Sequence, residues 1–229
     1  MAKTCFIMLM PGRTGSSYLV SCLRKHPQIS VEGEQLVALK SSEEQLRWIE
    51  RFYGRRQWRK RACGFKTKLK DVKDLTLFHD TLCAYSTRIV LVLRRDPFRQ
   101  AVSVLNARRL MDAYGVWNRD VSLPDLGPIE VDIERLDAEL KEVERRNLEL
   151  DVFSKTLKLS TIKVYYEDLF VPGSSEVWRV QEFLGVVPRE LVGDTKKTTP
   201  RDLSKAVANH SAIVAHYKNT PYEEFLVES

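Results

Sequence analysis

The residues nearest the amino terminus that could do chemistry form a loop at residues 11–17, between an apolar run and a helical pattern. Successive backbone amides in a glycine-containing turn can cradle an anion, and the amino end of the following helix adds its positive dipole end. Arg13 adds a charge that can fork onto two oxygens. The remaining amides and hydroxyls come from Thr14, Gly15, Ser16 and Ser17. The loop therefore predicts a phosphate-binding site.

The loop differs from the Walker A sequence, which places a lysine directly before its hydroxyl residue. Here Gly15 is followed by Ser16 and Ser17, and no acidic partner for a magnesium ion is evident. These differences count against a standard kinase or ATPase. The alternative without any function is a strand-to-helix turn capped by serine.

The elements that must position this loop alternate between strand and helix patterns. Apolar runs predict strands at residues 5–10, 28–31, 62–68, 88–93 and 161–166. Helical spacing predicts helices at residues 18–25, 43–56, 97–111, 131–157, 177–184 and 202–216. Alternation of this kind predicts an α/β fold of the P-loop nucleotide-binding type, with three layers and a central parallel sheet flanked by helices. Ligands of such sheets bind at the carboxyl ends of the strands.

Composition sets the class of protein. The 229 residues, with a formal net charge of +6, suit a single domain over residues 1–229, and the modest positive excess suits an anionic ligand. No stretch approaches the roughly 20 apolar residues of a membrane span. The four cysteines lie far apart without zinc spacing, which predicts reduced thiols in a cytoplasmic protein and no metal site: Cys5, Cys22, Cys63 and Cys83.

A second basic feature is the stretch at residues 51–61, which is dense in arginine, lysine and aromatic side chains. Such a stretch could contact nucleic acid or an acidic glycan, because phosphates attract basic groups and bases stack on aromatic rings. It could equally be a solvated helix face whose aromatic side chains pack inward. The sequence leaves these readings open.

Four motifs, in order along the chain, resemble the PAPS-dependent sulfotransferase superfamily, in particular its bacterial carbohydrate and tyrosylprotein branches. PAPS is 3′-phosphoadenosine-5′-phosphosulfate. The motifs are the loop PGRTGSSYL with the following His-Pro and Glu-Gly-Glu, the strand end LRRDP with a serine on the next helix, the strand end VYYEDL, and the tail at residues 195–226. The chain departs from the best-known cytosolic branch at Arg13, where that branch has lysine, and in lacking the Arg-Lys-Gly motif of its tail.

The resemblance implies a role for each motif in binding PAPS. The first loop would hold the 5′-phosphosulfate, with Arg13 taking up charge on the leaving phosphate. Arg95 and Ser103 would hold the 3′-phosphate, and Tyr166 would lie near the nucleotide. The tail would close over it, with Lys196 and Lys197 reaching the 3′-phosphate.

The resemblance also implies a general base for the acceptor hydroxyl. Glu34 is the candidate, because an acidic residue at its distance after His-Pro is the base in the tyrosylprotein branch, and Glu32 is its rival. A base in this position contributes roughly 10²- to 10⁴-fold to the rate. Both carboxylates could instead be solvated charges at a strand end. Lys66 and Lys68 lie at another predicted strand end, from which one of them could reach the same site.

The expected function is therefore in-line transfer of a sulfuryl group from PAPS to a hydroxyl of a carbohydrate or small molecule, without a metal. The product nucleotide would be adenosine 3′,5′-bisphosphate. Nucleic acid is not expected as a partner, and a homodimer stays open. The alternatives are a P-loop kinase-like phosphotransferase and a non-catalytic nucleic-acid-binding protein.

Overall fold

The computed structural model describes residues 3–54, 60–117, 123–124, 126–171, 173–194 and 202–226. The chain divides into two compact units. The first unit comprises Met1–Arg95 with Asn147–Thr195, and the second comprises Asp96–Arg146 with Lys196–Ser229. Each unit is therefore assembled from two separate stretches of the chain. The prediction of a single domain over residues 1–229 stays a prediction.

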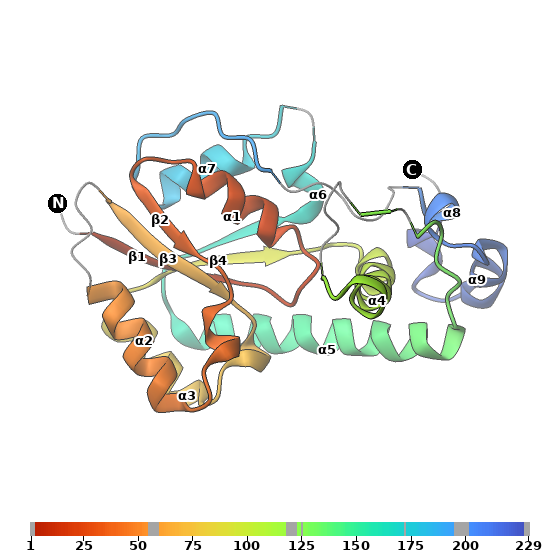
Figure 1. The fold of residues 1–229 in the computed structure, drawn as a ribbon, viewed down its shortest axis with the longest axis horizontal. Helices are drawn as coiled ribbons and strands as arrows, with labels where there is room; N and C mark the ends of the chain where they lie inside the picture. Colours follow the sequence, from red (N-terminus) through yellow and green to blue (C-terminus); the bar gives the residue numbers. More distant parts are fainter. Residues whose placement is uncertain are drawn as a thin grey trace. The chain divides into compact units, whose positions relative to one another are not determined.

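The first unit is built on a five-stranded sheet in which every pairing is parallel (Figure 1). The strand order is β2-β3-β1-β4-β5. The strands are β1 (Thr4–Leu9), β2 (Ile29–Glu32), β3 (Ala62–Thr67), β4 (Arg88–Leu93) and β5 (Thr161–Tyr165). All five predicted strands are present, and the one at residues 88–93 has the predicted bounds.

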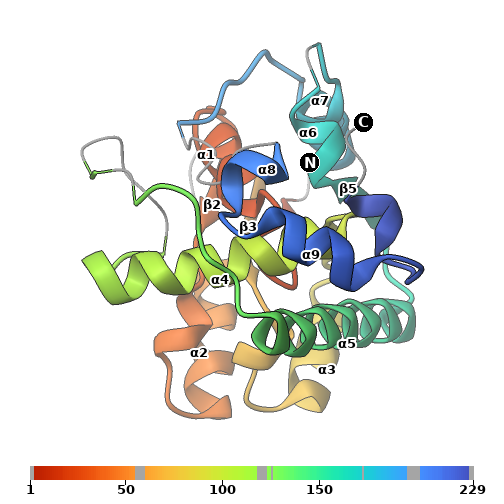
Figure 2. The same ribbon diagram turned by 90° about the vertical axis from the view of Figure 1, so that its right-hand side faces the viewer.

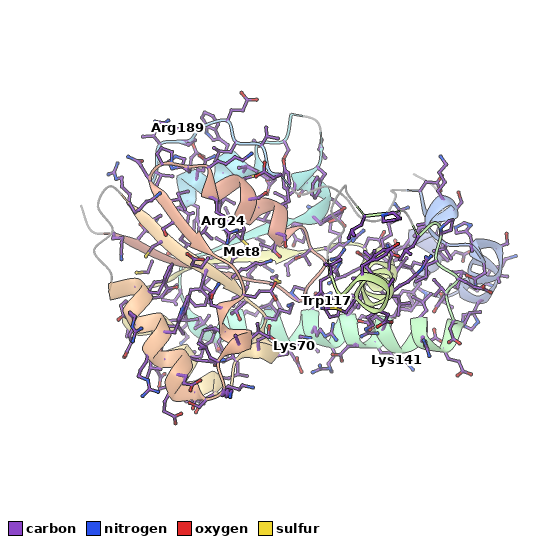
Figure 3. All side chains as sticks on the ribbon, viewed as in Figure 1. Met8, Arg24, Lys70, Trp117, Lys141 and Arg189 are labelled. Carbon is purple, nitrogen blue, oxygen red and sulfur yellow. The ribbon has the colours of Figure 1, made fainter. Side chains whose placement is uncertain are left out.

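The first strand, β1, occupies the centre of the sheet because its sequence is apolar on both faces. Its residues pair with β3 from Thr4 to Leu9 and with β4 from Phe6 to Leu9. The side chains from Phe6 to Leu9 are fully buried, and Met8 lies in the middle of the sheet (Figure 3). A strand buried on both faces reads as a continuous apolar run, which is how this segment reads.

Helices cover both faces of the sheet in the first unit (Figure 1). On one face α1 (Ser16–Arg24) and α7 (Glu176–Phe183) pack on even-numbered residues of the central strands. On the other face α2 (Ser42–Gly54), α3 (Leu75–Ala84) and the end of α5 (Ile133–Leu157) pack on odd-numbered ones. The predicted three-layer α/β fold with a parallel sheet is confirmed.

Shorter elements follow some of the strands in the first unit. A 3₁₀ turn at Gln35–Ala38 follows β2, and another at Leu69–Asp71 follows β3. The short helix α6 (Tyr166–Leu169) begins directly after β5. The sequence patterns did not predict α3, which begins where Asp74 caps it by accepting a hydrogen bond from the Leu77 amide at 2.9 Å.

The second unit is helical (Figure 2). It contains α4 (Pro97–Tyr114), the first part of α5, α8 (Leu203–Ala206), α9 (His210–Tyr217) and a 3₁₀ turn at Glu223–Phe225. Figure 2 shows α9 beside the start of α5, where the Tyr217 hydroxyl donates to Asp137 Oδ1 at 2.7 Å. The prediction of one helix over residues 202–216 is wrong, because Val207 adopts an extended conformation and forms an isolated bridge to Ile129.

Three further findings concern the described part of the chain. No helix in it is both long and apolar enough to cross a membrane. No group of three or more His, Cys, Asp or Glu side chains within it could hold a metal ion. All four cysteines carry free thiols.

Replacing Gly64 with alanine is expected to destabilise the first unit by about 1–3 kcal/mol, the usual cost of overpacking a core. The added Cβ would lie 2.4 Å from the backbone oxygen of Phe6 on the neighbouring strand, and backbone cannot move aside as a side chain can. Urea unfolding measures the loss. Gly54→Ala is the matched control, since nothing lies within 4 Å of its added Cβ. Equal stability of the two variants would contradict the close approach of β1 and β3.

Candidate functional site

The loop between β1 and α1 has the backbone of an anion cradle. Gly12, Arg13 and Gly15 all have positive φ angles, at 106°, 56° and 78°. From Arg13 through Thr14 to Gly15 the φ angle alternates in sign, because Thr14 has no positive φ, and such alternation points successive amides toward one side of a turn. Gly15 is the N-cap of α1 and offers no side chain, and no acidic residue lies in the first turn, so neither the cap residue nor a first-turn carboxylate caps the amides at this helix end.

Thr14, within the same loop, is fully buried. Its Oγ1 has no hydrogen-bond partner among the described residues. A buried hydroxyl without a partner costs free energy, commonly about 1–3 kcal/mol. Thr14 directly precedes the helix cap, so an anion bound at the start of α1 would lie near its hydroxyl and could accept a hydrogen bond from it.

The side chain of Arg94 contacts the backbone of this loop, and its charge acts on that of Arg13. Arg94, at the carboxyl end of β4, donates from Nη1 to the backbone oxygen of Arg13 at 3.5 Å, and its Cζ lies 4.3 Å from the centre of the Tyr166 ring. Burial, and then the positive charge of Arg94, lower the pKa of Arg13 to about 10, while Tyr166 acts in the opposite direction. Arg13 stays charged at neutral pH, and Arg94, whose Nε lies 3.9 Å from Glu167 Oε1, adds a second guanidinium, so two cations and one carboxylate lie near the loop.

Tyr166 itself lies against the loop. A Cβ added to Gly15 would come within 3.0 Å of Tyr166 Cδ2, so the loop backbone and the tyrosine ring are in close contact. The ring also packs on Phe170 with centroids 4.8 Å apart. The structure thus brings Tyr166, which was predicted to lie near the nucleotide, together with Arg13 and Gly15.

A second group of charges surrounds Glu34, which follows β2. Lys66 Nζ lies 3.1 Å from Glu34 Oε1, and Lys68 Nζ donates a hydrogen bond to Glu34 Oε2. Lys66 Nζ also donates to Ser17 Oγ at 2.9 Å, which connects this group to the start of α1. Both lysines therefore reach the predicted base, and one of them reaches the anion loop as well.

The environment of Glu34 sets its protonation state. Burial alone would raise the pKa of this carboxyl, but the hydrogen bond from Lys68 and the charges of Lys66 and Lys68 outweigh burial and lower it from its ordinary value. The pKa of Lys66 is lowered by burial, with Glu34 acting against that change. At neutral pH the site therefore contains an ionised carboxylate held by ammonium groups. Of the two candidate bases, Glu34 has these contacts and Glu32 does not.

Arg95 points to a different partner from Arg94. Its Nη1 and Nη2 donate to the two oxygens of Asp168 at 2.7 and 2.6 Å, and its Cζ lies 4.1 Å from the centre of the Tyr165 ring. The hydrogen bond raises the pKa of Arg95 and lowers that of Asp168. The side chain of Arg95 is half exposed. Its predicted contact with the 3′-phosphate would require it to exchange this carboxylate for a phosphate.

The other predicted nucleotide contacts belong elsewhere in the chain. Ser103 is buried on α4 in the second unit. That helix begins as predicted, with Asp96 accepting from the Arg99 amide at 2.7 Å and Pro97 at its first position. Lys196 and Lys197 lie outside the described residues. The assignment of these residues, and of Arg95, to the 3′-phosphate stays a prediction.

The pattern of side chains along β4 indicates that Arg94 faces the loop, which the resemblance to the motif did not indicate. Along β4, Val90 and Val92 face α1, whereas Ile89 and Leu91 face α2 and α3. Side chains alternate along a strand, so Arg94 continues on the face of α1 and its loop. The motif favoured Arg95, the second arginine of the pair, as the ligand-binding residue. The alternation along the strand favours Arg94, the first arginine, as the one that faces the loop.

Comparison with solved structures finds a protein of the same fold. A crystal structure of a sulfotransferase from Alicyclobacillus acidocaldarius matches over 95% of this chain and 92% of that chain, with a TM-score of 0.55 and 16% sequence identity. No family model and no curated protein matches the sequence. The match shows that the chain has the fold of that enzyme over nearly the whole of both chains.

Proposed function

We propose that this protein is a sulfotransferase that transfers a sulfuryl group from PAPS to a hydroxyl of a carbohydrate or small molecule. The observation that carries the proposal is the pair of guanidinium groups, Arg13 and Arg94, beside the uncapped amino end of α1. The fold shared with a sulfotransferase supports the reaction class. The contacts of Glu34 support the presence of a base at the same edge of the sheet.

The loop after β1 would bind the 5′-phosphosulfate. Its amides from Gly15 to Ser17 would donate to the phosphate oxygens, and the Thr14 hydroxyl would gain the partner that it lacks. Arg13 and Arg94 would neutralise the charge that develops on the leaving phosphate, where charged donors in a water-poor site act most strongly.

The transfer would proceed in line. Glu34 would accept the proton of the acceptor hydroxyl while that oxygen forms a bond to sulfur. The bond between sulfur and the bridging phosphate oxygen would break, and its electron pair would leave with adenosine 3′,5′-bisphosphate. The acceptor oxygen ends as a sulfate ester, and the proton ends on Glu34 before release to water. The protein contributes position and charge, as in phosphoryl transfer.

The 3′-phosphate would distinguish this nucleotide from ATP. We assign it to Arg95 and Ser103, with Lys196 and Lys197 of the tail as further contacts. Four free thiols suit a reducing compartment, so we place the reaction in the cytoplasm. A homodimer is compatible with this proposal and is tested by light scattering.

Calorimetry with adenosine 3′,5′-bisphosphate tests the nucleotide class. We expect wild-type protein to bind it without magnesium and in preference to ATP, and Arg95→Ala to bind it roughly 10- to 100-fold more weakly, the usual loss of a charged hydrogen-bonding group. Lys141→Ala, an exposed change on α5, is the control (Figure 3). A preference for ATP with magnesium would favour the kinase-like alternative. Salt-dependent oligonucleotide binding in place of nucleotide binding would favour the nucleic-acid alternative.

A further inference from the structure

Lys66 occupies a position between the two groups of the site. Its ammonium lies 2.9 Å from Ser17 Oγ and 3.1 Å from Glu34 Oε1, so one charge serves both the start of α1 and the predicted base. The residue is 7% exposed, and in such surroundings a charge acts more strongly on its neighbours than it would in water. A change of charge near Ser17 is therefore expected to change the strength of the ion pair between Lys66 and Glu34.

An anion at the start of α1 would compete with Glu34 for this ammonium. Ser17 is the second residue of α1, so its hydroxyl belongs to the helix end at which the phosphosulfate is proposed to bind. The phosphosulfate group carries two negative charges near neutral pH, one on its phosphate and one on its sulfate, against the single charge of a carboxylate. The stronger acceptor draws the ammonium toward itself, because Lys66 can turn about a flexible stem of four carbons.

Lys68 would remain with Glu34 when Lys66 moves. Its stem lies beside Gly12 of the first loop, since a Cβ added to Gly12 would lie 3.5 Å from Lys68 Cε, and its ammonium also lies 3.8 Å from Asp71 Oδ2. The remaining charge that acts on Lys66 is that of Arg24 on α1. Glu34 would thus keep its ion pair with Lys68, which fixes its position, and lose its ion pair with Lys66, which also contacts the start of α1.

We propose that Lys66 couples the two halves of the site, so that an anion bound at the start of α1 draws its ammonium from Glu34 and makes that carboxylate a stronger base. The inference rests on the proposed function, in which the anion is the phosphosulfate of PAPS. Before the donor binds, Glu34 is held by two lysines and accepts protons poorly. After it binds, the base is ready for the acceptor, so the donor must bind first for efficient transfer. Lys66 acts here through Glu34, as a positioning residue.

The pKa of Glu34, followed by NMR with isotope-labelled glutamate and assigned with Glu34→Gln, tests the coupling. It is measured with and without saturating adenosine 3′,5′-bisphosphate in wild-type protein and in Lys66→Met, which keeps the length of the side chain and removes its charge. The nucleotide's own charge raises the pKa in both proteins. We expect the rise to be larger in wild type by about one unit, since only there can a cation leave the carboxylate.

Controls separate the coupling from the function and from folding. Lys70→Met removes an exposed lysine from the neighbouring turn and should leave the wild-type rise unchanged (Figure 3). Lys66→Gln replaces Lys66→Met if the latter does not fold. Inorganic sulfate, as a second ligand, probes the loop without the nucleotide.

The two proposals fail in different ways. Equal rises in wild type and Lys66→Met, with nucleotide binding intact by calorimetry, would overturn the coupling and leave the sulfotransferase proposal standing. Absence of nucleotide binding, together with a larger rise in wild type on addition of sulfate, would overturn the function and support the coupling.

Discussion

Arg13→Ala is expected to weaken the binding of adenosine 3′,5′-bisphosphate by roughly 10- to 100-fold, because a charged donor to a phosphate contributes more than a neutral one. Arg13 is a mostly buried residue of the loop that would hold the 5′-phosphate, and burial and the charge of Arg94 both disfavour its charged form. The same change should leave the free energy of unfolding of the ligand-free protein unchanged or increased. Alanine retains a Cβ, so the strain of the positive φ angle at this position is unaltered.

The opposite directions of these two effects make the prediction specific. Calorimetry gives the affinity, and urea unfolding without ligand gives the stability. Arg189→Ala is the matched control, because Arg189 is an exposed arginine of the same unit and should affect neither quantity (Figure 3). A variant that unfolds easily and still binds the nucleotide would show that Arg13 supports the fold and not the site.

Glu34→Gln is expected to lower kcat for sulfuryl transfer by roughly 10²- to 10⁴-fold, the range for loss of a general base. It should also strengthen nucleotide binding, because Lys66 and Lys68 lose the carboxylate that competes for their charge. The measurement uses radiolabelled PAPS with a panel of carbohydrate hydroxyls, from which the wild-type enzyme first identifies the acceptor. Glutamine preserves the shape of the side chain and removes its charge and basicity.

Glu32→Gln is the control for this second prediction. Glu32 ends β2 two residues earlier and lacks the contacts with the two lysines, so its replacement should change kcat by less than about tenfold. A larger loss from Glu32→Gln than from Glu34→Gln would exchange the roles of the two carboxylates. A loss of both kcat and nucleotide affinity in Glu34→Gln would mean that the carboxylate holds the loop in place.

The fold could be predicted from the sequence because its strands are short apolar runs separated by helical patterns. Residues 88–93 show this most clearly, since four of the six are fully or almost fully buried and none but Arg88 is polar. The helix at Leu75–Ala84 was missed because its polar and apolar residues do not form a clear stripe. The break at Val207 could not be predicted from periodicity, because it depends on pairing with Ile129, far away in sequence.

The site was predictable in parts. The anion loop follows from Gly12, Arg13 and Gly15, whose backbone angles are those that a cradle needs. The meeting of Arg13 with Arg94 depends on the pairing of β1 with β4, which brings two distant strand ends together. In the same way, the contact of Lys66 with Glu34 depends on β2 pairing with β3. Spacing along the chain contains no information about such neighbours.

The parallel pairing of β4 with β5 has a consequence for synthesis on the ribosome. β4 is an apolar strand whose outer edge stays open until Thr161–Tyr165 has been made, about seventy residues later. At usual translation rates that delay lasts about 4 to 14 seconds. An open apolar edge is a template for pairing with other chains, so we expect half-made chains to aggregate at high expression. Weaker expression, which lowers the concentration of half-made chains, should increase the soluble yield.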